Sequence, residues 1–274
     1  MNYLETLYSI ENRVTVLTGG GGILAGALAK GFIQAKAKVV LLDINKENLM
    51  ETIESFKNIG YDVLGFQCDV LDETSVKKTH QKILDAFKRI DILINAAGGN
   101  MHGATIGIDQ TVFDLPMDQF KKVMDLNFHG TVLPTMIFGK SMANQKSGSV
   151  INISSMASSR VITRVVGYSA AKAAIDNFTK WMAVELAQKF SSGIRVNAIA
   201  PGFLLTEQNR TLLTNEDGSL TERGKNIIKS TPFQRFGEPE ELVGTVIWLA
   251  SDASKFITGA IIPIDGGFSV FSGI

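Results

Sequence analysis

Short runs of aliphatic and β-branched residues alternate along the chain with longer segments in which apolar residues recur at helical spacing. The short runs lie at residues 14–17, 39–42, 63–66, 90–94, 150–153, 194–199 and 261–264. The longer segments lie at residues 25–34, 46–58, 75–88, 117–144, 168–190 and 239–251. Alternating strands and helices are typical of a parallel sheet with crossover helices. The pattern therefore predicts an α/β fold, a doubly wound seven-stranded parallel sheet flanked by helices on both faces.

The chain shows no sign of division into separate domains. It contains no linker rich in Pro, Ser or Gly, no internal repeat and no low-complexity tract. We therefore expect one domain over residues 1–274. Two connections, at about 98–116 and 201–238, are longer than the turns of a compact domain, and the second has a helical pattern of its own. Long connections of this kind commonly carry function, so we interpret both as substrate-loop insertions.

Composition excludes several classes of protein. The 27 Lys plus Arg balance the 27 Asp plus Glu, which disfavours nucleic acid and anionic membrane surfaces as partners. Cys68 is the single cysteine, and His80, His102 and His129 lack metal-ligand spacing, so we expect neither an internal disulfide nor a metal site. No apolar run approaches the ~18 residues that cross a bilayer, and the first residues do not resemble a secretion signal. We expect a cytoplasmic protein.

A glycine-rich turn follows the first predicted strand and opens the first predicted helix. It carries four consecutive glycines, Gly19 to Gly22, and Asp43 stands at the end of the second strand. Glycines allow the backbone to approach a pyrophosphate, whose charge then meets the amides of the helix N-terminus. A carboxylate at Asp43 can accept hydrogen bonds from the adenosine ribose and would repel a 2′-phosphate. The arrangement predicts a dinucleotide site that prefers NAD over NADP.

A tyrosine and a lysine lie one helical turn apart in the segment 168–190. Residues i and i+4 share a helix face, so the Lys172 ammonium can lie near the Tyr168 hydroxyl and lower its pKa toward the range of a useful acid or base. Ser155 stands upstream, at the end of the fifth strand. Taken alone, the pair is equally compatible with a capping aromatic and a solvated lysine.

Two asparagines occupy positions that call for hydrogen bonds. Asn95 begins an Asn-Ala-Ala-Gly sequence that ends at Gly98, directly after the fourth strand. Asn127 lies within an otherwise apolar helical segment, where an unpaired amide is costly. We interpret Asn127 as either a buried structural bridge or a group that holds a water molecule.

Taken together, these motifs resemble the short-chain dehydrogenase/reductase superfamily over essentially the whole sequence. The resemblance rests on the glycine turn, the Asn-Ala-Ala-Gly sequence and Pro201-Gly202, together with Asn127, Ser155, Tyr168 and Lys172 in that order. It implies a Rossmann-type domain, a nicotinamide cofactor and a catalytic tetrad. In that tetrad Tyr168 would protonate the carbonyl oxygen and Ser155 would hold it. Lys172 would lower the tyrosine pKa and bind the nicotinamide ribose, and Asn127 would anchor a water molecule.

The resemblance also assigns a set of cofactor contacts. The implied cofactor-binding residues are Gly19, Gly22, Ile23, Leu24, Asp43, Asp69, Val70, Asn95, Gly98, Tyr168, Lys172 and Pro201. Asp69 and Val70 would contact adenine, and Pro201 would meet the nicotinamide. The sequence differs from the family pattern at Ile23 and Ala25, where the family has glycines.

The two long connections resemble those of the short-chain type of D-mannonate oxidoreductase, also called fructuronate reductase. This implies interconversion of D-fructuronate and D-mannonate. A sugar acid needs a cation for its carboxylate and polar partners for its hydroxyls. The predicted substrate residues are Asn100, Ser155, Arg164, Tyr168 and Arg210, with His102, Gln208 and Asn209 on the same bordering segments.

Two other functions stay open at this point. Another polyol, deoxy-sugar-acid or keto-sugar dehydrogenase could use the same scaffold, and the insertions alone do not separate these substrates. A dinucleotide-sensing module without chemistry is disfavoured because all four tetrad residues are present. We also expect a homotetramer or homodimer, because the long helices 117–144 and 168–190 resemble those that pair between subunits in this superfamily.

Overall fold

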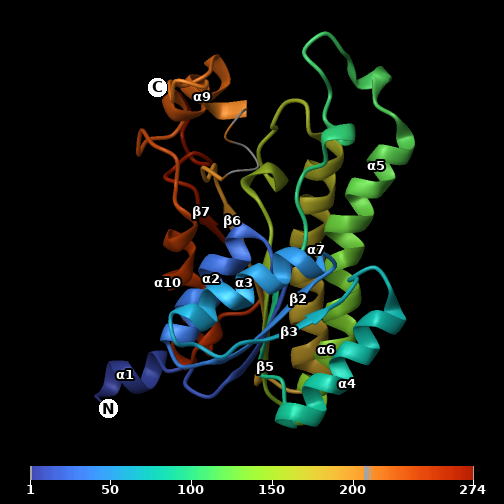
Figure 1. Cartoon of the computed structure of the whole chain (residues 1–274), viewed down its shortest axis with the longest axis vertical. Coiled ribbons are helices and arrows are strands. Elements are labelled where there is room, and N and C mark those ends of the chain that lie inside the picture. The colour runs from blue at the N-terminus through green and yellow to red at the C-terminus, as the bar shows by residue number, and fades with distance from the viewer. Residues whose placement is uncertain (1, 207–209, 211, 274) are drawn as a thin grey trace.

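All seven predicted strands form one parallel sheet in the computed structural model, which describes residues 2–206, 210 and 212–273 (Figure 1). The sheet order is β3-β2-β1-β4-β5-β6-β7. The strands are β1 (Val14–Thr18), β2 (Lys38–Asp43), β3 (Leu64–Gln67), β4 (Ile92–Asn95), β5 (Gly148–Ile153), β6 (Ile194–Pro201) and β7 (Ile261–Ile264). The reversal of strand order between β1 and β4 is that of a doubly wound sheet, so the predicted fold class is confirmed.

Helices cover both faces of the sheet, as predicted (Figure 1). One core contains Leu28 and Phe32 of α2 with Val246 of α10, and the other contains Phe138 of α6 and Leu186 of α7. The first face carries α2 (Ile23–Gln34), α3 (Lys46–Asn58) and α10 (Val243–Ala250), and the second carries α4 (Glu73–Phe87), α6 (Gly130–Gln145) and α7 (Val166–Lys189). Burial of these apolar side chains from both sides explains why the central strands are apolar throughout rather than alternating.

The predicted helix at residues 117–144 is not continuous. It consists of α5 (Met117–Met124), one turn of π-helix at η3 (Asp125–His129) and then α6. The wider turn places Asn127, which is fully buried, at the break. Such π-turns occur frequently at functional sites, and this one carries a predicted catalytic residue.

The two long connections contain short helices. The first includes the 3₁₀ turns η1 (His102–Ala104) and η2 (Val112–Asp114), and the second includes α9 (Glu222–Lys229), as its helical pattern predicted. Further 3₁₀ turns lie at η4 (Met156–Ser158), η5 (Pro239–Leu242) and η6 (Asp252–Ser254). Both insertions rise above the carboxyl ends of the strands, where ligands bind in doubly wound sheets (Figure 1).

A short amino-terminal helix, α1 (Tyr3–Tyr8), was not predicted. Asn2 and Glu5 form a reciprocal capping box that starts it. None of its residues is buried, so its apolar positions give no core-facing stripe. Among the described helices of the whole protein, none combines the length and the apolar character that crossing a membrane requires.

A series of buried amides and hydroxyls joins the centre of the sheet to α6 and α7. The Asn95 amide donates to Thr135 Oγ1 and to Asn152 Oδ1, both at 2.8 Å. The Asn152 amide in turn donates to Thr179 Oγ1 at 2.8 Å. Buried polar groups of this kind require partners, and here the partners fix how α7 sits on β5.

Candidate active site

The carboxyl end of β5 lies against the first turns of α7 and brings three predicted catalytic residues together. Tyr168 and Lys172 share one face of α7, with the Lys172 Nζ atom 5.5 Å from the centre of the Tyr168 ring. Lys172 Nζ donates a 2.7 Å hydrogen bond to the Ile153 carbonyl, the last residue of β5. Ser155, two residues later, caps η4 by accepting a hydrogen bond from the Ala157 amide. The predicted cluster of Ser155, Tyr168 and Lys172 therefore forms through this strand end.

Lys172 is a buried cation. The residue is only 4% exposed, and burial lowers its pKa from 10.5 to about 8, although the carboxylate of Asp176 opposes this effect. Removing an ammonium group from water disfavours its charged form. The alternative of a solvated surface lysine does not describe this residue. At neutral pH the group is protonated, and it loses its proton in mildly alkaline solution.

The expected effect of Lys172 on Tyr168 is wrong for this structure. The pKa of Tyr168 is raised above 10, because burial disfavours the phenolate, and hydrogen bonding with the Ser155 hydroxyl lowers it only in part. The ammonium group of Lys172 donates its hydrogen bond to the Ile153 carbonyl. Tyr168 is therefore a protonated hydroxyl at neutral pH, which suits a proton donor rather than a base.

Asn127 forms a bridge to the strand-end loop after β4. Its Oδ1 accepts a 3.0 Å hydrogen bond from the Gly99 amide, and its Nδ2 donates to the Gly99 carbonyl at 2.8 Å and to the Val123 carbonyl at 2.9 Å. Of the two interpretations of this residue, the geometry favours the structural bridge, because both amide protons are used by the protein. The bridge fixes the loop beside Lys172.

Gly98 is the point at which this loop passes between two predicted catalytic residues. A Cβ atom there would lie 2.7 Å from Asn127 Oδ1 and 3.6 Å from Lys172 Nζ. Its φ of +153° also lies in a region that other residues rarely adopt. The predicted position of Gly98 in the site is thus required by both space and backbone conformation.

The glycine turn and Asp43 form a cradle suited to a dinucleotide. No side chain caps the start of α2 at Gly22, which leaves the first amides of the helix for an anionic ligand. The Gly21 amide donates a 2.9 Å hydrogen bond to Asp43 Oδ2, so the carboxylate at the end of β2 lies beside the turn. Gly19 has a φ of +69° and no room for a Cβ against Ala97. These residues fit the predicted cofactor.

The difference from the family glycine pattern is accommodated in the helix. Ile23, the first residue of α2, is 40% exposed, and Ala25 is buried in the core below it. Leu24 packs partly against the same core. The side chain of Ile23 therefore lies at the surface of the cradle rather than filling it.

The other predicted cofactor residues lie at the ends of strands. Asn95 is 1% exposed and donates its two amide protons to Thr135 of α6 and Asn152 of β5. The side chain of Asn95 thus stabilises the strand end beneath the site through hydrogen bonds inside the protein. Asp69 follows β3 and accepts a hydrogen bond from the Leu71 amide, Val70 packs beneath Gly130, and Pro201 ends β6 beside β7. Their cofactor contacts stay predictions.

Besides Ser155 and Tyr168, the predicted substrate residues lie on the two insertions and the loop before α7. The Asn100 amide donates to Thr105 Oγ1 at 2.6 Å, and Arg164 Nε donates to the Ile106 carbonyl at 2.5 Å. Ile106 returns the bond through its amide to the Arg164 carbonyl at 2.9 Å, which joins the first insertion to the start of α7. Arg210 is exposed in the second insertion. Gln208 and Asn209 lie outside the described residues.

Sequence reasoning missed Arg223, in the first turn of α9. Burial and then the positive charge of Arg164 lower the pKa of Arg223, so the two guanidinium groups lie within electrostatic range of each other. Neither forms an ion pair with a carboxylate within the described part of the protein. The helical pattern of the insertion was visible in the sequence, but its approach to Arg164 depends on the fold.

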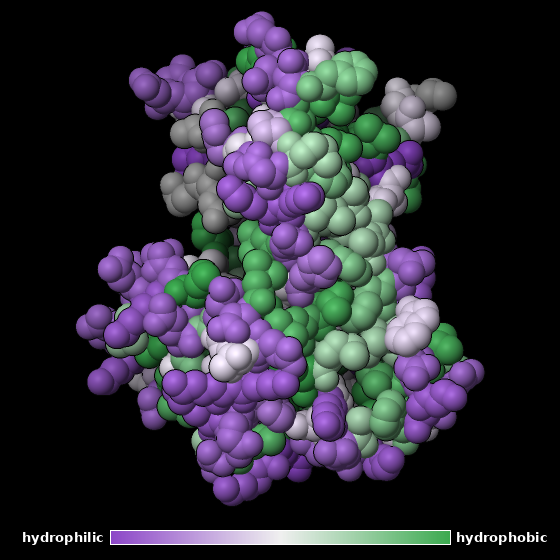
Figure 2. All heavy atoms as spheres, turned by 90° about the vertical axis from the view of Figure 1, so that its right-hand side faces the viewer, coloured by the Kyte–Doolittle hydropathy of each residue, from purple (hydrophilic) through white to green (hydrophobic). Residues whose placement is uncertain are grey.

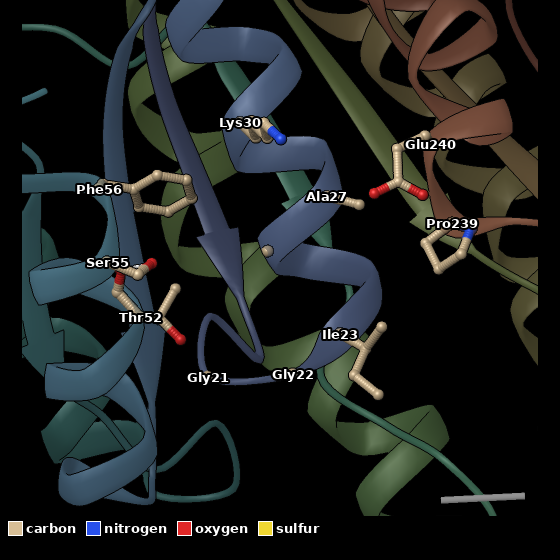
Figure 3. Close-up of a pocket in the computed structure, with 11 residues that line it drawn as sticks. Gly21, Gly22, Ile23, Ala27, Lys30, Thr52, Ser55, Phe56, Pro239 and Glu240 are labelled. Atoms are coloured by element: carbon tan, nitrogen blue, oxygen red, sulfur yellow. Dashed lines mark hydrogen bonds between the residues drawn. The ribbon is translucent and has the colours of Figure 1, made fainter. Parts of the chain in front are cut away.

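A separate groove of about 370 Å³ borders the glycine turn (Figure 3). It lies between α2, α3 and η5, with Lys30 and Glu240 among the residues that line it. It includes none of the four predicted catalytic residues, so we do not assign it to the reaction. Among the residues that the structure describes, no group of three or more His, Cys, Asp or Glu side chains is placed to hold a metal ion.

Comparison with known proteins agrees with this geometry. Residues 22–269 match the family model described as enoyl-(acyl carrier protein) reductase. The chain is 41% identical over 275 residues to the uncharacterized oxidoreductase UxuB of Bacillus subtilis (strain 168), covering 97% of this chain and 98% of that protein.

Solved structures extend the comparison. A provisionally named D-mannonate oxidoreductase from Haemophilus influenza, crystallised with bound NAD, is 39% identical, with a TM-score of 0.91 and full coverage of both proteins. The NAD⁺-bound xylitol dehydrogenase is 30% identical, with a TM-score of 0.84 over 94% of this chain and 99% of that one. The full coverage of the Haemophilus protein includes both long insertions.

The space around Gly98 can be tested with a matched pair of variants. We expect Gly98→Ala to lower catalytic efficiency about 100-fold, because the new methyl group displaces the Asn127 amide next to Lys172. Gly99→Ala is the control, since Gly99 has a similar φ of +146° but nothing within 4 Å of the added carbon. Steady-state kinetics and thermal melting of both variants separate misplacement from backbone strain. Equal losses in the two variants would contradict the assignment.

Proposed function

This protein belongs to the short-chain dehydrogenase/reductase family, and on that premise we propose that it interconverts D-fructuronate and D-mannonate with NAD(H). The observation that carries the proposal is the placement of Tyr168 and the buried Lys172 on one face of α7, against the carboxyl end of β5 that leads to Ser155. The choice of substrate is supported by the resemblance of both insertions to D-mannonate oxidoreductases of the short-chain type, and by the Haemophilus structure of that provisional name.

The choice of NAD rests on the end of β2. The Asp43 carboxylate lies where the adenosine ribose would bind, and it would repel the phosphate of NADP. The following residues, Ile44 and Asn45, offer no cation to receive that phosphate. Two similar structures contain NAD, which agrees with this assignment.

The catalytic residues divide the proposed reduction among them. Bound NADH supplies the hydride that reduces the ketone. Ser155 holds the carbonyl oxygen by a hydrogen bond, and Tyr168 donates the proton that this oxygen takes up. Lys172 supplies a fixed positive charge beside the tyrosine. Asn127 keeps the Gly98 loop in place, so that the reacting groups share one small volume.

Two arginines support an acid as the substrate. Arg164 lies in the loop before α7, four residues before Tyr168, and Arg223 of α9 lies within electrostatic range of Arg164. Two guanidinium groups within electrostatic range of each other repel, and an anion bound between them would relieve that repulsion. A substrate carboxylate would supply that charge and accept hydrogen bonds from both. A plain polyol offers no such group.

The two other candidate functions would each give a different experimental result. A dehydrogenase of a polyol, a deoxy-sugar acid or a keto sugar would use the same Tyr168 and Lys172 and differ in the insertions. The NAD⁺-bound xylitol dehydrogenase is a relative of the polyol kind. A dinucleotide sensor would bind NADH without turnover.

We also propose that the protein forms a homodimer or homotetramer. Apolar side chains gather on the face formed by α5 and α6 (Figure 2). Met136 of α6 and Trp181 and Val184 of α7 are each more than half exposed. Apolar patches of this kind mark protein contacts, and a second copy would cover them. We place the enzyme in the cytoplasm, in keeping with its free, buried Cys68.

The proposed reaction can be measured directly. Purified protein should oxidise NADH with D-fructuronate faster than with a panel of other keto sugars and keto acids. Tyr168→Phe removes the donated proton and should lower kcat about 10²–10⁴-fold while NADH still binds. Activity with another substrate but not with D-fructuronate would discard the sugar-acid assignment. NADH binding with no turnover of any substrate would favour the sensor.

The arginine pair predicts a selective change in KM. We expect Arg223→Gln to raise KM for D-fructuronate about tenfold or more, because a charge-assisted hydrogen bond is lost, with kcat changed less than about threefold. Lys225→Gln, on the same helix and paired with Glu222, is the control and should leave KM unchanged. D-fructose, which lacks the carboxylate, should be insensitive to either change. An unchanged KM in Arg223→Gln would rule out the contact.

A further inference from the structure

We propose that Asp176 is a positioning residue that, anchored by Ser154, holds the Lys172 side chain in its charged form beside Tyr168. The inference rests on the proposed oxidoreductase function but not on the identity of the substrate. Asp176 lies one turn beyond Lys172 and two turns beyond Tyr168 on the same face of α7. Its position was visible in the sequence as an i+4 neighbour of the lysine, although its partner was not.

Asp176 is tied to the strand end by a buried hydroxyl. Ser154, which is 2% exposed, donates a hydrogen bond to Asp176 Oδ1. The same hydroxyl lies 3.5 Å from the Lys172 carbonyl. Charge-assisted hydrogen bonds of this kind are stronger and shorter than neutral ones. Ser154 therefore fixes the carboxylate against the turn of α7 that carries the lysine.

The strand end contacts two successive turns of α7. The Ile153 carbonyl accepts from Lys172, and Ser154 donates to Asp176, one turn further along the helix. The Ile153 carbonyl is neutral, so it satisfies a proton of the ammonium without balancing its charge. Asp176 supplies that balance, and its field opposes the loss of charge that burial imposes on Lys172.

Other charged groups around Lys172 do not replace Asp176. On the elements that pack against α7, Asp118 pairs with Lys122 on α5, and Asp125 pairs with His129 on η3, in both cases at the surface. Lys121 of α5 and Lys140 of α6 are exposed. Strand β5 and η4 carry no titratable side chain. On β6, Arg195 is bonded to the carbonyls of Leu249 and Ser251. Tyr168, on α7 itself, has a raised pKa and is neutral at neutral pH.

The test is the pH dependence of activity in charge-matched variants. With saturating NADH and the best keto substrate, the alkaline fall in kcat/KM should move down by about one pH unit in Asp176→Asn. Asp176→Glu, which restores the charge, should return the fall close to its original position. A purely structural role would lower activity equally at every pH. An unchanged alkaline fall in folded Asp176→Asn would overturn the inference.

A second readout does not depend on turnover. The ¹³Cε resonance of Lys172, assigned with Lys172→Arg, gives its titration midpoint in the protein alone. Asp176→Asn should lower that midpoint by about one pH unit, and Ser154→Ala should lower it by less, since the carboxylate is freed but kept. If wild-type protein reduces no substrate, the proposed function fails while this titration still decides the role of Asp176. Equal midpoints in wild type and in both variants would refute it.

Discussion

The register between the carboxyl end of β5 and one face of α7 is the constraint on which the site depends. Deeper in the sheet, Asn152 fixes α7 through Thr179. At the edge, the Ile153 carbonyl fixes it through Lys172. Because these contacts join consecutive residues of β5 to positions two turns apart on α7, a slip of the helix by one residue would break them together. The reactive side chains are thus held by the same contacts that hold the fold.

Two further segments complete the site: the π-turn at η3 and the glycine turn before α2. The π-turn at η3 directs Asn127 toward the backbone of Gly99, which brings Gly98 between the amide and the lysine. The glycine turn before α2 is packed just as closely, since Cβ atoms at Gly20 and Gly21 would lie within 2.8 Å of Leu41 and Asn48. The run of four glycines thus serves close packing as well as the cofactor cradle. This explains how the sequence differs from the family pattern at Ile23 and still offers open amides.

The sheet and the tetrad could be predicted because both leave local signals. Buried parallel strands are short apolar runs in the sequence. The spacing of four residues between Tyr168 and Lys172 predicts that they share one face of a helix. The break at Asp125–His129 could not be predicted, because no residue type demands a π-turn and the hydrogen bond from Asn127 to Gly99 that accompanies it joins residues far apart in the sequence. The predicted direction of the Tyr168 pKa shift was wrong for a similar reason: burial raises this pKa, and burial depends on the whole fold. The buried hydrogen bonds of Asn95 to Thr135 and Asn152 could not be predicted either, because its position at a strand end does not reveal its partners.

Hydride transfer at this site is the central claim, and isotope tracing tests it most directly. NADH carrying deuterium at the transferred position of the nicotinamide should be incubated with the protein and D-fructuronate, and the acid product examined by NMR. The account predicts one deuterium on the newly formed carbinol carbon for each NADH oxidised. NADH oxidation that leaves the sugar acid unlabelled, or no oxidation at all, would contradict it.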